Sequence, residues 1–179
     1  MSADLHARAR DIRLLVLDVD GVLTDGQLYF TEQGEELKAF DTQDGHGIKM
    51  WRQAGHRLAI ITGRRSQLVL HRARNLGIDL VLQGREDKGR ALDEVCAQLS
   101  IPVDAVAYCG DDLPDLGALR RARLAVAPAN AHPFVQEHVH WVTTRSGGHG
   151  AVRQICDFML QAQGHLEALQ GAYLLESPT

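Results

Sequence analysis

Short runs of apolar residues, separated by amphipathic segments, recur along the 179-residue chain and constrain its fold more than any other feature. The runs occupy residues 13–18, 57–63, 79–84, 105–112 and 123–127, and residues 140–144 are a candidate sixth. Runs without polar alternation are typical of strands buried on both faces of a parallel sheet. Helical patterns lie at 47–54, 66–76, 88–99, 113–121 and 150–163. This order predicts one α/β domain over residues 1–179, with a parallel sheet sandwiched by helices.

One segment interrupts the alternation of strands and helices. Residues 27–40 contain two β-prone arms around Gln33 and Gly34, which predicts a hairpin directly after the first strand. We interpret the charges of its second arm, in the sequence GEELKAF, as a solvated face. The hairpin is the only insertion that the sequence indicates, so we expect no large cap domain.

Composition narrows the class of partner and the cellular location. The net charge of −4 and the lack of a basic tract argue against nucleic acid as the main partner. The apolar runs are too short to cross a bilayer, and the N-terminal residues contain no apolar signal region. The three cysteines, at positions 96, 109 and 156, have no metal-type spacing and fit a reducing cytoplasm.

Polar residues gather where the predicted strands end. Ligands of open parallel sheets bind at the carboxyl ends of the strands. The chemically active side chains expected there are Asp18 and Asp20 after the first strand, Thr62, Gly63 and Arg64 after the second, Lys88 after the third, and Asp111, Asp112 and Asp115 after the fourth.

Carboxylates gathered at one edge repel one another unless a cation lies among them. Asp18 and Asp111 offer the oxygen ligands that suit Mg²⁺. The Thr62 hydroxyl, a free backbone N–H and the Lys88 ammonium suit the oxygens of a phosphate group. The sequence therefore predicts Mg²⁺-dependent phosphoryl chemistry.

These residues also carry a family resemblance. DVDGVLTDG, ITGR, Lys88 and GDDLPD resemble the four motifs of the haloacid dehalogenase (HAD) superfamily. With GEELKAF, DGHGIK, AHP and GGHGAVRQICDFMLQAQG, nearly the whole chain is similar to the 3-deoxy-D-manno-octulosonate 8-phosphate (KDO 8-phosphate) phosphatases. The resemblance implies a Rossmann-like fold and Mg²⁺-dependent hydrolysis of KDO 8-phosphate through an aspartyl-phosphate, in lipopolysaccharide biosynthesis.

The resemblance also implies a role for each motif residue. Asp18 would be the nucleophile, and Asp20 the general acid and then the general base. Mg²⁺ would be held by the Asp18 and Asp111 carboxylates and the Asp20 carbonyl. Thr62, Gly63 and Lys88 would bind the phosphoryl oxygens, while Asp112 and Asp115 would orient metal-bound waters and Lys88.

Contacts to the sugar acid are implied less directly. Its carboxylate suits guanidinium groups, and the resemblance indicates Arg64 and Arg72, together with the loop at 41–45 and Lys49. The candidate substrate-binding residues are Asp44, Gly45, Lys49, Arg64 and Arg72. The resemblance leads us to expect a basic residue at position 43 and arginines at positions 49 and 149, where this chain has Gln43, Lys49 and His149. The resemblance further implies a homotetramer in which a neighbouring subunit and C-terminal tails wall the site.

Other readings of the sequence remain open. The substrate could be a nine-carbon sugar acid 9-phosphate. The domain could also be a non-catalytic oligomerisation module of the sialic-acid-activating type, which the presence of all the motif residues opposes. We interpret the glycine-rich turn at 147–150 as a flexible hinge, and His138 and His140 as solvated side chains.

Overall fold

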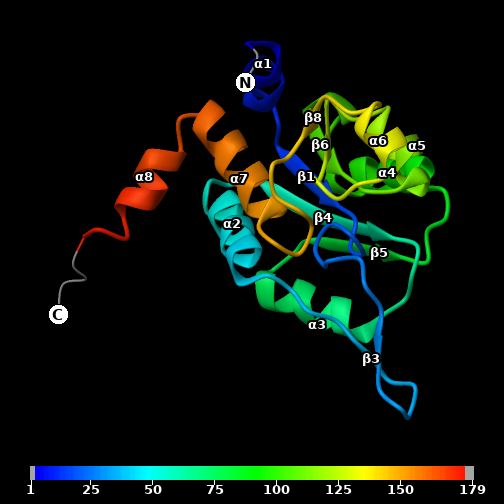
Figure 1. Cartoon of the computed structure of the whole chain (residues 1–179). Helices are drawn as coiled ribbons and strands as arrows, with labels where there is room; N and C mark the ends of the chain where they lie inside the picture. The colour runs from blue at the N-terminus through cyan, green and yellow to red at the C-terminus, as the bar shows by residue number, and fades with distance from the viewer. Residues whose placement is uncertain (1–2, 176–179) are drawn as a thin grey trace.

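The computed structural model describes residues 3–175 and contains a central parallel sheet with helices on both faces (Figure 1). In the described chain the sheet has six strands, in the order β5-β4-β1-β6-β7-β8. Their bounds are β1 Leu14–Leu17, β4 Arg57–Thr62, β5 Leu80–Gln83, β6 Val106–Cys109, β7 Leu124–Ala127 and β8 Trp141–Val142. The α/β prediction is confirmed, including the candidate sixth strand.

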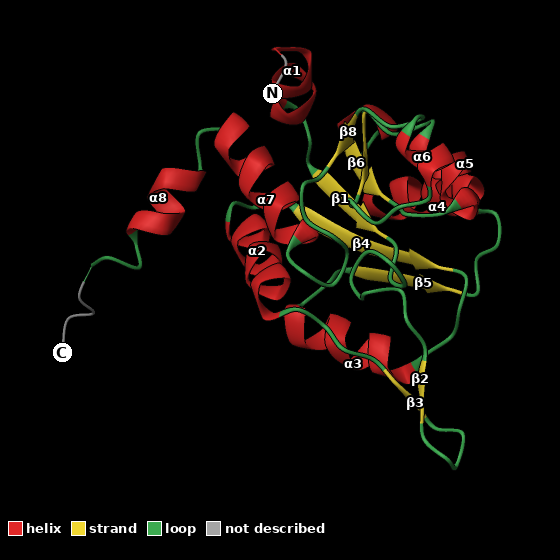
Figure 2. Ribbon diagram, in the orientation of Figure 1, coloured by secondary structure: helices red, strands yellow, loops and turns green. Residues whose placement is uncertain are grey.

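Two helical layers cover the sheet (Figure 2). One apolar core lies beneath α1 (Ala3–Arg10), α2 (Thr42–Gln53), α3 (Gln67–Leu76) and α7 (Ala151–Ala162). The other lies beneath α4 (Lys88–Leu99), α5 (Leu116–Leu119) and α6 (Pro133–Gln136). Two 3-10 helices, η1 (Val103–Ala105) and η2 (Leu113–Asp115), connect elements, and α8 (Leu166–Gly171) extends from α7.

The strand order places a crevice at the end of β1. From β1 the chain proceeds to β4 and β5 on one side, then crosses to β6, β7 and β8 on the other. The order therefore reverses between β1 and β6, and in open α/β sheets such a reversal marks the ligand site. Asp18 follows β1 directly, and Asp111 lies two residues beyond β6.

The predicted hairpin is present as β2 (Tyr29–Phe30) paired antiparallel with β3 (Glu36–Leu37). Between β1 and α2 the described chain contains no other regular element, in agreement with the absence of a large cap. Helix α2 begins at Thr42 rather than at residue 47 because Asp41 caps it, accepting a hydrogen bond from the Asp44 backbone N–H. The sequence patterns also missed α1 and α6.

Cys109 and Cys156 are buried in the core, and all three cysteines are free thiols. Over residues 3–175, no helix combines the length and apolar character that a membrane span requires.

Candidate active site

One cavity of about 330 Å³ collects the predicted phosphate and metal residues at the carboxyl edge of the sheet. Its lining includes Asp18, Asp20, Thr62, Gly63, Arg64, Lys88, Asp111, Asp112 and Asp115. These residues come from four separate segments of the sequence, so the fold brings together the set that the motifs predicted.

The loop after β1 is held tightly in place by its own backbone. The Val19 carbonyl accepts hydrogen bonds from the backbone N–H groups of Val22, Leu23 and Thr24. Gly21 has φ +88°, and a Cβ there would overlap the Asp111 carboxylate. Only glycine therefore allows this loop to pass so close to the end of β6.

The glycine-rich turn braces the same loop. Gly148 donates a 3.0 Å backbone hydrogen bond to the Val22 carbonyl, and Asn130 Oδ1 accepts one of 2.7 Å from the Gly147 N–H. A Cβ on Gly147 would overlap the carbonyl of Gly21. The turn is thus packed against the loop that carries Asp20, which differs from the flexible hinge expected from the sequence.

Asp115 organises the charges behind the cavity. Its side chain is fully buried, and its Oδ1 accepts hydrogen bonds of 2.7 Å from Lys88 Nζ and from the Tyr108 hydroxyl. Its Oδ2 accepts the backbone N–H groups of Asp111 and Asp112 at 3.2 and 3.3 Å. Lys88 Nζ also lies 2.8 Å from Asp18 Oδ2. Asp115 therefore fixes the Lys88 ammonium beside the Asp18 carboxylate.

Burial and mutual repulsion dominate the electrostatics of the acids. Burial and then the Asp115 charge raise the pKa of Asp18 to about 7, although Lys88 acts in the opposite direction. Burial and the charges of Asp18 and Asp115 raise the pKa of Asp111 to about 7. Burial alone would lower the pKa of Lys88, but its two carboxylate partners raise it. Negative charge is thus unfavourable here without a further cation.

The donor set fits a hard divalent cation. Asp18, Asp111 and Asp115 each offer a carboxylate oxygen, and these atoms lie within 4.8 Å of one another. Both oxygens of Asp115 already accept hydrogen bonds, which leaves Asp18 and Asp111 as the available ligands. Carboxylate oxygens on one side of an open cavity suit Mg²⁺, which keeps several waters.

Asp20 contacts two cations from outside its own loop. Its Oδ1 accepts a hydrogen bond from Lys38 Nζ, and its Oδ2 lies 3.8 Å from Arg64 Nε. The Lys38 side chain is only 2% exposed, so the reading of this arm as a solvated face was wrong for Lys38. Lys38 directly follows β3, and no local feature of the sequence indicates that its side chain is covered.

The proposed sugar-binding residues divide into two groups. Arg64 lines the cavity, whereas Gly45, Lys49 and Arg72 line a separate cavity of about 210 Å³. The Arg72 guanidinium donates to the Asp41 carbonyl at 3.1 Å.

Asp44 belongs to neither group of residues. It is 1% exposed and accepts backbone hydrogen bonds from Gly150 and Arg153 at 3.4 and 2.7 Å, so it caps α7. The structure therefore does not bring its carboxylate to the cavity that contains Asp18.

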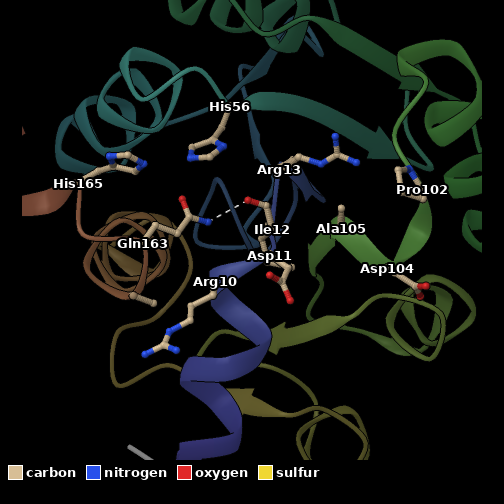
Figure 3. A pocket seen from close by; sticks show the side chains of 11 residues that line it. Arg10, Asp11, Ile12, Arg13, His56, Pro102, Asp104, Ala105, Gln163 and His165 are labelled. Carbon is tan, nitrogen blue, oxygen red and sulfur yellow. Dashed lines mark hydrogen bonds between the residues drawn. The ribbon is translucent and has the colours of Figure 1, made fainter.

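A larger cavity, of about 680 Å³, lies at the opposite edge of the sheet (Figure 3). Arg13, His56 and Ala105, which line it, each precede a strand of the parallel sheet. None of the acids that follow β1 or β6 reaches it, so its size does not make it the active site. His138 and His140 are both exposed, as expected, and His140 Nδ1 accepts a 2.9 Å hydrogen bond from the Ala125 N–H.

Comparison with known proteins settles the family. Residues 81–155 match the model of the haloacid dehalogenase-like hydrolases. The chain is 46% identical over 171 residues to 3-deoxy-D-manno-octulosonate 8-phosphate phosphatase KdsC of Escherichia coli, covering 96% of this chain and 91% of that protein. The chain belongs to the KDO 8-phosphate phosphatase family of the HAD superfamily.

Solved structures agree with membership of the KDO 8-phosphate phosphatase family. A Moraxella catarrhalis member in complex with a magnesium ion, a phosphate ion and KDO has a TM-score of 0.94 and 40% identity, over 97% of this chain and 99% of that one. A probable phosphatase from Pseudomonas syringae has a TM-score of 0.96 and 52% identity, over 98% and 100%.

Proposed function

We propose that this protein is a Mg²⁺-dependent phosphatase that hydrolyses KDO 8-phosphate to KDO and inorganic phosphate. The supporting observation is the single cavity in which Asp18, Lys88, Thr62 and Asp111 meet, in a chain that covers almost the whole of its KdsC relative. The reaction would serve lipopolysaccharide biosynthesis.

Asp18 is the proposed nucleophile. One of its carboxylate oxygens forms a bond to phosphorus while the bond from phosphorus to the sugar oxygen breaks. Asp20 gives a proton to that sugar oxygen, and later takes a proton from the water that releases phosphate from Asp18. Lys88, Thr62 and the Gly63 N–H bind the phosphoryl oxygens as their charge shifts.

The metal would be held by the carboxylates of Asp18 and Asp111 and by the carbonyl of Asp20. A bound Mg²⁺ supplies positive charge that lets an anionic nucleophile approach an anionic substrate. The raised pKa of both carboxyl groups supports this assignment, because a cation relieves their repulsion. Asp112 and Asp115 are proposed to orient metal-bound water and Lys88, respectively.

We also propose a homotetramer whose subunits complete one another's sites. The hairpin exposes Leu28, Tyr29, Phe30 and Leu37, and the C-terminal segment exposes Tyr173, Leu174 and Leu175. Such apolar surface suits burial against another copy. Contact between subunits would also give Gly45, Lys49 and Arg72 a route to the substrate of a neighbour. A Phe30→Asp variant that remains a tetramer in light scattering would contradict the hairpin's part in assembly.

A cytoplasmic location is proposed as well, supported by the three free thiols.

Phosphate release with and without Mg²⁺ tests the chemistry. Asp18→Asn is nearly isosteric, so the fold should survive while turnover falls by about 10³-fold or more, as for other groups that act as a unit. Asp104→Asn, at an exposed aspartate of the opposite edge, is the matched control and should keep full activity. Near-normal turnover of metal-replete Asp18→Asn would rule out the nucleophile assignment.

A further inference from the structure

The side chain of Lys38 is covered in a place where a lysine side chain is expected to be solvated. It directly follows β3, whose Leu37 is 55% exposed, yet its own side chain is only 2% exposed. Ordering a lysine side chain costs conformational entropy, and its ammonium also loses hydration. A specific set of partners must offset both costs.

Those partners connect the hairpin to the active site. Lys38 Nζ donates a hydrogen bond to Asp20 Oδ1 and lies 3.3 Å from Glu36 Oε1. The same Glu36 oxygen accepts a 2.9 Å hydrogen bond from Arg64. Lys38, Glu36 and Arg64 therefore form a chain of alternating charges that begins and ends at the Asp20 carboxylate.

The two cations approach Asp20 differently. Arg64 lines the cavity and is 46% exposed, whereas Lys38 does not line the cavity. Lys38 occupies Oδ1 at hydrogen-bond distance, while Arg64 stays 3.8 Å from Oδ2. Oδ2 is thus the oxygen left to exchange a proton with the ester oxygen of a substrate.

We propose that Lys38 is a positioning residue, which holds Asp20 from the hairpin side so that Oδ2 faces the leaving group. The inference rests on the proposed function, because it concerns the proton that Asp20 donates. Lys38 touches neither substrate nor metal in this scheme. Correct placement of the hairpin becomes a condition for proton transfer, since Lys38 moves with β3.

The test compares kcat/KM, which reports the steps up to departure of the alcohol, for two leaving groups. An alkoxide needs a proton to leave, whereas p-nitrophenolate does not. Lys38→Met should lower kcat/KM for KDO 8-phosphate by about 10- to 100-fold, part of the 10²–10⁴-fold range of general acid catalysis. The value for p-nitrophenyl phosphate should change little, and Lys38→Arg should recover much of the loss.

Two further variants separate positioning from general stability. In an Asp20→Asn background, Lys38→Met should have almost no additional effect, because its route of action is already removed. Arg57→Met removes a 52% exposed cation that pairs with Asp79 at 3.5 Å, and should leave both substrates unaffected.

Several outcomes would overturn the proposal. The proposal fails if Lys38→Met lowers kcat/KM equally for the two substrates, or if Lys38→Met keeps full activity. It also fails if Lys38→Met lowers kcat/KM as much in the Asp20→Asn background as in the wild type. A wild type that hydrolyses other sugar phosphates but not KDO 8-phosphate would instead refute the proposed substrate, and the Lys38 comparison would then use those esters. A wild type inactive on every phosphate ester would refute both.

Discussion

Lys88→Met removes the cation between two buried carboxylates and should destabilise the metal-free protein strongly. Lys88 is 4% exposed, and its Nζ lies 2.8 Å from Asp18 and 2.7 Å from Asp115. Removing one partner of a buried ion pair typically costs about 3–5 kcal/mol, because a buried charge is left unpaired. At roughly 2–4 °C per kcal/mol for a chain of this size, the unfolding temperature should fall by about 6–20 °C.

The assay is thermal unfolding in the presence of a chelator, with Arg121→Met as control. Arg121 pairs with Asp93, and both side chains are about half exposed, so solvent screens the pair and its loss should destabilise the protein far less than the loss of Lys88. The Lys88→Met deficit should shrink as pH falls toward about 7, because loss of Lys88 raises the pKa of Asp18 further and the variant then neutralises Asp18 with a proton that the intact protein does not bind. Bound Mg²⁺ should also reduce the deficit.

Phosphate release gives an independent reading of the same variant. Loss of one donor to a transition-state oxyanion typically lowers kcat by about 10²–10³-fold, and we expect a loss of that size at saturating Mg²⁺. The reasoning fails if Lys88→Met is no less stable than Arg121→Met, or if its deficit is independent of pH.

Three other predictions follow from the site. Asp20→Asn should lower kcat/KM for the sugar acid far more than for an aryl phosphate and let phosphoenzyme accumulate in rapid-quench experiments; equal loss without accumulation would contradict the dual role. Arg72→Ala should raise KM for the sugar acid about tenfold, or ~1.4 kcal/mol, and leave KM for p-nitrophenyl phosphate little changed. An equal loss of activity on both substrates would mean that Arg72 only supports the loop at Asp41, whose carbonyl it contacts. The pKa values of Asp18 and Asp111 are raised to about 7, so between about pH 4 and 7 the folded protein holds protons that the unfolded chain has lost. The stability of the metal-free protein should therefore decline as pH rises from about 4 through 7, and Mg²⁺ binding should release protons below pH 7. Calorimetry of Mg²⁺ binding in buffers of different ionisation enthalpy measures this release, and finding none would contradict the prediction.

Strands and motif residues were predictable because their signals are local. A strand buried on both faces is an unbroken apolar run, and parallel strands deliver their next residues to one edge. The sequence alone is therefore enough to group Asp18, Thr62, Lys88 and Asp111 at one edge of the sheet. Helix α1 was not predicted because only Leu5 and Ala9 of its eight residues are buried, and two apolar positions give too weak a helical periodicity.

Contacts between distant segments could not be predicted in the same way. Asp44 has no local sign that it caps α7, more than 100 residues later in the sequence. Lys38 appears in sequence as an ordinary hairpin lysine, and its burial depends on where the hairpin meets the loop of Asp20. The glycine turn at 147–148 likewise acquires its role only when α7 brings it against the backbone of Gly21 and Val22.

The most direct test of the central claim is kcat/KM of the purified enzyme for KDO 8-phosphate, a nine-carbon sugar acid 9-phosphate and p-nitrophenyl phosphate, each with Mg²⁺ and with a chelator. The account predicts that KDO 8-phosphate is hydrolysed far more efficiently than the other two, and that its hydrolysis stops on chelation and returns with Mg²⁺. A preference for the nine-carbon substrate, or hydrolysis that persists without a divalent cation, would contradict it.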